Sequence, residues 1–112
     1  MPAAWTSPGH SVRSGARSTV PASAPGLALA RWCRALGHPA RIVIVRHLAV
    51  RREPCTAGEI AAQVPLAQST VSRHLRVLVS AGLLRAQVVR PRVFYRLDEQ
   101  AVAEFRRAAL SL

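Results

Sequence analysis

Residues 68–76, with the sequence QSTVSRHLR, gather side chains that can hydrogen-bond to nucleic acid. Short polar groups come first, and basic or imidazole groups follow; the set comprises Gln68, Ser69, Thr70, Ser72, Arg73, His74 and Arg76. Val71, Leu75 and Leu78 recur at i, i+4 and i+7, which predicts an apolar stripe along one helix. The polar side chains would then point away from the core at the N-terminal end of that helix. Short donors and acceptors suit base edges and arginines suit phosphate or guanine, so the pattern predicts a DNA-reading helix. The alternative interpretation is a solvated helix face that lacks acids.

The charge of the chain is strongly one-sided. Sixteen arginines oppose five acids, which gives a formal net charge of +11. No acid occurs from residue 60 to residue 97, whereas six arginines do: Arg73, Arg76, Arg85, Arg90, Arg92 and Arg96. A segment of one sign and this length would attract polyanions. A GC-rich genome would explain the use of arginine over lysine, but it would not explain the missing acids.

The composition indicates one folded domain of 112 residues, half of them hydrophobic. Residues 1–25 are rich in Ser, Ala, Pro and Gly without a period, and we interpret them as a disordered arm before a domain over residues 26–112. Two cysteines and no secretory signal favour a reducing cytoplasm. No run of 18 apolar residues occurs, so we expect no membrane span.

Helical spacing predicts two helices in the first part of this domain. Residues 27–36 form the first, which Gly37 ends. Pro39 begins the second, since proline suits a first helical position. The predicted inner faces are Leu29, Trp32, Cys33 and Leu36 on the first helix, and Ile42, Val45, Leu48 and Ala49 on the second. We expect Ile44 to face a neighbouring helix or a second subunit.

A capping box, Thr56 to Glu59, begins a short third helix that ends near residue 64. The polar helix follows after a tight turn, so the pair has the pattern of a helix-turn-helix. Residues 83–89 and 93–97 are strand-like and flank Arg90-Pro91-Arg92, which predicts a hairpin, or wing, with Arg90 and Arg92 as further DNA contacts. Asp98 caps a last helix that reaches about residue 110. The predicted fold is mainly α with a small β-hairpin, a winged helix-turn-helix in the order α-α-α-α-β-β-α.

Residues 35–97 resemble the ArsR family of winged-helix repressors. The resembling pieces are ALGHPARIVIV at 35–45, TAGEIA at 56–61, QSTVSRHLRVL at 68–78, AGLL at 81–84 and VFYRLD at 93–98. The resemblance implies a homodimer that pairs through its first and last helices, residues 27–36 and 98–110. It also implies that the polar helix enters a major groove of double-stranded DNA while the wing reaches the adjacent backbone or minor groove. The operator would be an imperfect palindrome with half-sites about one helical turn, or ~34 Å, apart.

The sequence departs from the family pattern at two places. Ala67 stands where members often carry Ser or Thr, so the polar helix loses a side-chain cap of roughly 1 kcal/mol, and Ser69 could cap it instead. One family metal site uses two cysteines flanking a single residue, but Thr56 and Gly58 occupy those positions and Cys55 stands alone. Another uses Asp and His on the last helix, which has no histidine here. We therefore predict no metal site and no cofactor.

Four single residues have predicted roles of their own. Cys33, on an apolar helix face, is expected to be a small core residue. Cys55, at the end of a loop, is expected to be more exposed and is the candidate for a thiol switch. His38 is expected to cap or orient the second helix. His74 has two interpretations, a DNA contact or a polar group that braces the turn.

The predicted function is a dimeric, sequence-specific DNA-binding transcriptional repressor. The alternative is a basic RNA- or ribosome-associated winged helix; the polar helix tip favours DNA, because the major groove of A-form RNA is closed to side chains. A third interpretation is a protein-interaction module whose basic surface only aids solubility. We predict no enzyme, since no strand-turn-helix elbow presents a serine nucleophile. The inducer stays open between none, a thiol switch through Cys55 and a small molecule at the dimer interface.

Overall fold

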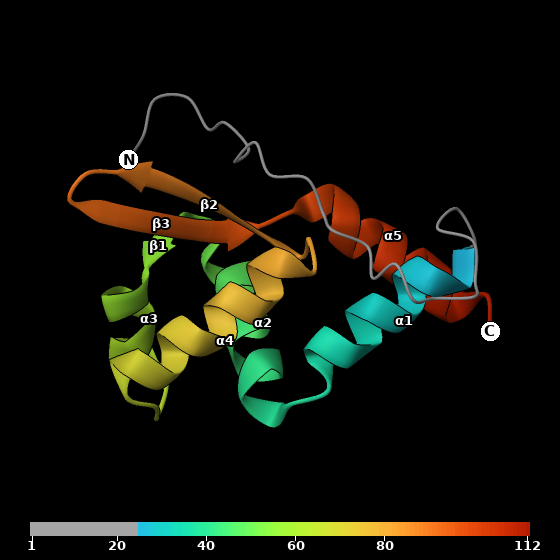
Figure 1. The fold of residues 1–112 in the computed structure, drawn as a ribbon, viewed down its shortest axis with the longest axis horizontal. Helices are drawn as coiled ribbons and strands as arrows, with labels where there is room; N and C mark the ends of the chain where they lie inside the picture. The colour runs from blue at the N-terminus through green and yellow to red at the C-terminus, as the bar shows by residue number, and fades with distance from the viewer. Residues whose placement is uncertain (1–24) are drawn as a thin grey trace.

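In a computed structural model, residues 25–112 form five helices and a three-stranded antiparallel sheet (Figure 1). The elements are α1 (Pro25–Leu36), α2 (Pro39–Arg51), β1 (Cys55–Thr56), α3 (Ala57–Gln63), α4 (Gln68–Ser80), β2 (Leu84–Val89), β3 (Arg92–Leu97) and α5 (Glu99–Leu110). The arm predicted over residues 1–25 lies outside the described residues, apart from Pro25 at the start of α1. The predicted winged helix-turn-helix is confirmed. Across residues 25–112, no helix is both long and apolar enough to span a bilayer.

The sequence prediction missed the strand β1. It contains two residues, and it pairs with β3 through Cys55 opposite Tyr95 and Thr56 opposite Phe94. Two residues are too few to show the alternating pattern that identifies a strand. The corrected order is α-α-β-α-α-β-β-α, with β3 at the centre of a β1-β3-β2 sheet.

Side-chain caps fix the start of three helices, as predicted. The His38 side chain accepts a hydrogen bond from the Ala40 amide (3.2 Å) at the start of α2. The capping box of α3 is complete, because Thr56 Oγ1 accepts from the Glu59 amide (3.1 Å) and Glu59 Oε1 accepts from the Thr56 amide (2.9 Å). Asp98 Oδ1 accepts from the Ala101 amide (3.0 Å) and so begins α5. Each cap satisfies an amide that has no partner within its helix.

Helix α4 begins without such a cap. Ala67 occupies the cap position and α4 starts at Gln68, so Ser69 lies inside the first turn. The prediction that Ser69 caps the helix is therefore wrong. Its side chain is exposed instead.

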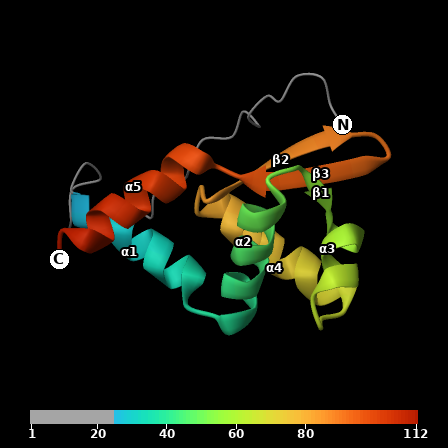
Figure 2. The ribbon, with the colours of Figure 1, turned by 180° about the vertical axis from the view of Figure 1, so that it is seen from behind.

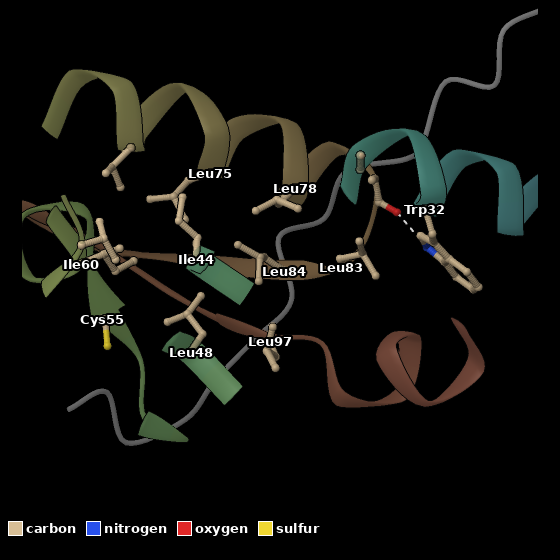
Figure 3. Packing of buried hydrophobic residues seen from close by; sticks show 14 residues of the cluster. Trp32, Ile44, Leu48, Cys55, Ile60, Leu75, Leu78, Leu83, Leu84 and Leu97 are labelled. Carbon is tan, nitrogen blue, oxygen red and sulfur yellow. Dashed lines mark hydrogen bonds between the residues drawn. The ribbon is translucent and has the colours of Figure 1, made fainter. Parts of the chain in front are cut away.

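The hydrophobic core lies where α2, α3 and α4 pack against the base of the hairpin (Figure 3). Helix α4 contributes the stripe predicted from its spacing, with Val71, Leu75 and Leu78 all 0% exposed. The inner face predicted for α2 is confirmed at Leu48, which is buried, and at Val45 and Ala49, which pack against the core. It is wrong at Ile42, which is 36% exposed, and Ile44, expected to face a neighbouring helix or a second subunit, is fully buried in the core. The β-branched run at 42–45 allows several stripes by spacing alone, and the packing of α2 on α4 and β3 selects the one through Ile44 and Leu48.

Helices α1 and α5 lie side by side at one end of the molecule, and α3, the start of α4 and the wing lie at the other (Figures 1 and 2). Trp32 joins α1 to its surroundings, because its indole Nε1 donates to the Ala81 carbonyl (3.1 Å) and its ring meets Phe105 edge-on at 6.2 Å. The prediction that Cys33 is a core residue is wrong. Its side chain is exposed, since the buried positions on α1 are Trp32 and Ala35.

Candidate nucleic-acid interface

The N-terminal half of α4 presents polar side chains to solvent while its opposite face is buried. Gln68, Ser69, Arg73 and Arg76 are exposed, and Thr70 and Ser72 are half-buried. The rigid stripe of Val71, Leu75 and Leu78 beneath them holds the helix against the core. Six of the seven residues predicted from the QSTVSRHLR segment are therefore accessible, at least in part, on one helix edge.

The turn before α4 fixes the angle between α3 and α4. The Val64 amide donates to the Ile60 carbonyl (3.1 Å) and ends α3, and the Leu66 amide then donates to the Val64 carbonyl (2.8 Å). A Cβ placed on Gly58 would stand 3.4 Å from Gln68 Oε1, so the Gln68 side chain lies against the start of α3. The distance is that of an ordinary van der Waals contact, so a small side chain at this position would fit beside Gln68.

A cleft of about 390 Å³ connects the start of α4 with the wing. Its walls include Gln68 and Ser72 from α4 and Arg92 from β3. Tyr95 lines the same cleft; its burial raises the pKa of its hydroxyl, and the nearby Arg76 guanidinium acts in the opposite direction. The structure therefore brings the start of α4 and the wing together around one cleft, with Arg92 in its wall and Arg73 and Arg76 exposed on α4. Arg90 and Arg92 are exposed at the tip of the hairpin, as the pattern predicts.

His74 is buried and does not belong to this exposed edge. Its side chain is only 7% exposed, and its Nδ1 accepts a hydrogen bond from Arg41 Nε (3.1 Å). Burial lowers the pKa of His74, and the neighbouring His38, Arg41 and Arg73 lower it further. The structure therefore places His74 away from the exposed edge proposed to meet DNA, and its contact braces α4 against α2 and not against the turn.

Cys55 is buried as well, which corrects the expectation that it is exposed. The residue is 0% exposed in β1, and its Sγ donates to the Glu53 carbonyl at 3.4 Å. Burial raises the pKa of the Cys55 thiol, although Arg51 acts in the opposite direction. Because the reactive form is the thiolate, a buried thiol with a raised pKa is poorly suited to act as a switch.

No metal-binding group appears in the part of the chain that the structure describes. Within residues 25–112, no three His, Cys, Asp or Glu side chains come close enough together to hold an ion.

The sequence analysis missed two features of this surface. Arg41 donates from α2 into the back of α4, a contact that spacing within α4 cannot reveal. Val88 and Val89, near the tip of the wing, are 59% and 42% exposed although valine is typical of buried strands. Their exposure could have been predicted from the adjacent Arg90-Pro91-Arg92 turn, because strand residues next to the tip of a projecting hairpin have no core to pack against.

A helix-turn-helix followed by a basic antiparallel hairpin defines the winged helix-turn-helix class of DNA-binding domains. Residues 36–87 match the family model for a helix-turn-helix domain. The chain is 36% identical over 76 residues to an HTH-type transcriptional regulator of Mycobacterium tuberculosis, and the aligned region covers 68% of this chain and 69% of the regulator. It is 34% identical over 70 residues to the biofilm growth-associated repressor of Agrobacterium fabrum, and the aligned region covers 62% of this chain and 58% of that repressor.

A solved structure extends the likeness to nearly the whole described fold. It is the homodimeric winged helix-turn-helix DNA-binding domain of a possible ArsR-family transcriptional regulator from Mycobacterium bovis, with a TM-score of 0.65 and 25% identity. The match covers 84% of this chain and 88% of that one. This chain belongs to the ArsR family of winged helix-turn-helix transcriptional regulators. None of these relatives supports the RNA-binding alternative.

Proposed function

We propose that this chain is a transcriptional repressor that binds a specific sequence of double-stranded DNA as a homodimer. The observation that carries the proposal is the position of the wing beside the exposed edge of α4: Gln68 and Ser72 on α4 line the same cleft as Arg92 on the wing. Further arginines are exposed on the helix and the wing, namely Arg73, Arg76 and Arg90. The shape of this surface, a helix edge beside a projecting hairpin, suits a major groove and the backbone next to it. Repression would follow because the bound dimer covers a promoter.

The residues on this surface divide by chemistry into three roles. Short side chains at the start of α4 suit base edges, because they can donate and accept at close range. Arginine can contact a guanine edge or a phosphate, and arginines on a wing can follow the adjacent strand or enter the minor groove. The proposed assignments are Gln68, Ser69, Thr70 and Ser72 to base edges, Arg73 and Arg76 to guanine or phosphate, and Arg90 and Arg92 to the backbone or minor groove.

The proposed dimer forms through α1 and α5. Among its described residues, α5 buries none completely within one chain, and its apolar residues Ala101, Val102 and Phe105 are only half-buried. A second copy packed on this end would complete their burial. Two copies related by a twofold axis would present two α4 helices to an imperfect palindrome whose half-sites are about one helical turn, ~34 Å, apart. The homodimeric state of the Mycobacterium bovis domain supports this arrangement.

The test is selection of bound sequences from a random duplex pool, followed by affinity measurements on the enriched site. We expect an imperfect palindrome. Arg73→Ala and Arg76→Ala should each weaken binding by about 1–3 kcal/mol if the arginine contacts a base, or lower the salt dependence by about one counterion if it contacts a phosphate.

Arg46→Ala is the matched control, because it removes the same charge from an exposed position on α2, a helix outside both the proposed DNA surface and the proposed dimer interface. It should change the affinity far less than either substitution on α4. Enrichment of no sequence from the pool, or equal losses for Arg46→Ala and the two α4 variants, would overturn the proposal.

A further inference from the structure

One guanidinium joins three helices behind the proposed DNA surface. Arg41 lies in the first turns of α2; its Nε donates to His74 Nδ1 on α4 (3.1 Å) and its Nη1 donates to the Ala35 carbonyl on α1 (3.2 Å). Helix α4 carries the proposed base contacts, and α1 belongs to the proposed dimer interface. Arg41 therefore links the position of each recognition helix to the helix that pairs the two subunits.

The contact between Arg41 and His74 requires a neutral imidazole. Arg41 can only donate, so His74 Nδ1 must present its lone pair and the ring proton must reside on Nε2. A protonated His74 carries a proton on both nitrogens, and its Nδ1 would then face the Arg41 donor with a donor of its own. The same proton would place two positive charges at hydrogen-bonding distance.

The described groups that act on His74 all destabilise its protonated form. The charged and titratable groups that act on it are His38, at the cap of α2, Arg41 on α2 and Arg73 on α4, and all of them disfavour the charged imidazole. The His38 ring stands 4.5 Å from the His74 ring, centroid to centroid, while its own Nδ1 accepts the Ala40 amide. His74 is 7% exposed, so water has little access to it.

We propose that Arg41 is a positioning residue for DNA binding and that its contact with His74 is a proton-sensitive latch. In the neutral state the latch holds α4 at the angle to α1 that lets both recognition helices of a dimer meet one operator. Protonation of His74 breaks the contact, removes the link from Arg41 to α4 and weakens operator binding. This inference rests on the proposed function.

The latch predicts that operator affinity falls toward acid pH, which is opposite to the effect of protonating exposed histidines. Protonation of exposed histidines adds positive charge, which strengthens binding to a polyanion as the pH falls. The latch weakens binding as the pH falls, and its limiting slope is tenfold per pH unit for each of the two His74 side chains of a dimer, because the DNA-bound dimer must expel a proton from each. The direction of the change therefore identifies the cause.

The test compares the wild-type protein with His74→Asn on the selected operator between pH 8 and pH 5 at constant ionic strength. The asparagine Oδ1 can stand near the place of Nδ1 and accept from Arg41, and it does not titrate. We expect the wild-type affinity to fall below pH 6.5, by at most tenfold per pH unit for each His74 side chain of the dimer, and the His74→Asn affinity to stay level or rise. His47→Asn is the matched control on α2 and should keep the wild-type pH profile.

A second variant tests the positioning role at a single pH. Arg41→Lys keeps the charge but lacks the planar fork that reaches two acceptors at once. It should lower operator affinity at pH 8, and it should also flatten the pH profile, whereas a residue with a merely structural role would lower affinity and leave the profile unchanged. A wild-type affinity that is constant or rises toward acid pH, or an equal acid loss in His74→Asn, overturns the latch.

The folding stability gives a readout that needs no DNA. Because the pKa of His74 is lowered in the folded state, the unfolded chain binds the proton more readily at acid pH. The contribution of neutral His74 to stability is therefore present above the ordinary value of 6.5 and is lost as the pH falls below it. Urea unfolding should show this loss in the wild type and not in His74→Asn. If neither protein binds DNA at pH 8, the proposed function fails, and the unfolding data alone decide the latch.

Discussion

The two ends of the molecule differ in how completely one chain can build them. At the recognition end, formed by α3, α4 and the wing, the apolar stripe of α4 is fully buried and its polar edge is exposed. At the pairing end, formed by α1 and α5, the described residues of α5 include none that is fully buried. Contacts within one chain therefore complete the core of the recognition end, whereas the pairing end leaves half-buried apolar residues for a second copy to cover.

This difference suits the separate tasks proposed for the two ends. A surface that must match DNA needs a rigid support, because small changes in angle move the base contacts out of reach. A surface that pairs with its own copy gains stability when the dimer forms, so it can stay incomplete in the monomer. Trp32 and Arg41 connect the two. Trp32 on α1 donates to the Ala81 carbonyl at the end of α4, and Arg41 on α2 donates both to His74 on α4 and to the Ala35 carbonyl on α1.

The largest expected effect is on the support of the recognition end. Leu75→Ala removes a fully buried side chain from the inner face of α4 and should cost about 2–5 kcal/mol of unfolding free energy. Urea denaturation followed by circular dichroism measures it. Arg76→Ala, one position along on the exposed edge, should change stability by only about 0.5 kcal/mol while it weakens DNA binding. A small loss for Leu75→Ala would show that α4 does not depend on the core beneath it.

The next effect should appear at the pairing end and should depend on protein concentration. Phe105→Ala removes the edge-on partner of Trp32 and half-buried apolar surface on α5. We expect a loss of roughly 1–3 kcal/mol, less than the 3–5 kcal/mol typical of a fully buried Phe, and a larger dimer dissociation constant. Sedimentation velocity over a dilution series measures the second quantity. Val88→Ala, which trims exposed apolar surface on the wing, should leave dimerisation unchanged; an equal shift would place the interface elsewhere.

The sequence predicted the features that arise from local rules. The caps at Thr56, His38 and Asp98, the stripe of α4 and the hairpin with its arginine tip each follow from residues close in sequence. Six of the seven polar positions assigned to α4 are accessible because the helical period fixes which side faces the core.

The sequence could not predict features that depend on contacts between distant elements. His74 falls on the boundary between the buried and exposed sides of α4, and only the approach of Arg41 from α2 decides its environment. Cys55 follows a proline at the end of a loop, but pairing with Tyr95 on β3 buries it. Contacts with distant elements also decide which residues of α1 are buried. Trp32 turns toward Ala81 and Phe105, which leaves Cys33 exposed.

The smallest expected effect concerns the starts of α3 and α4, which differ although they form one motif. Helix α3 has a complete capping box, while Ala67 gives α4 no side-chain cap. The backbone at Ala67 is already extended, with φ −68° and ψ 150°, so a serine there could accept an amide of the first turn without a change of conformation. Ala67→Ser should therefore raise the unfolding free energy by about 0.5–1 kcal/mol, seen as a higher urea midpoint with an unchanged slope.

Ala62→Ser on α3 controls for the substitution itself, because it adds the same hydroxyl at an exposed position inside a helix and should bring no gain. Thr56→Ala should lower stability by about 1 kcal/mol, since it breaks the box that α4 lacks. If Ala67→Ser and Ala62→Ser behave alike, the start of α4 is held by its packing on α3 and not by its cap.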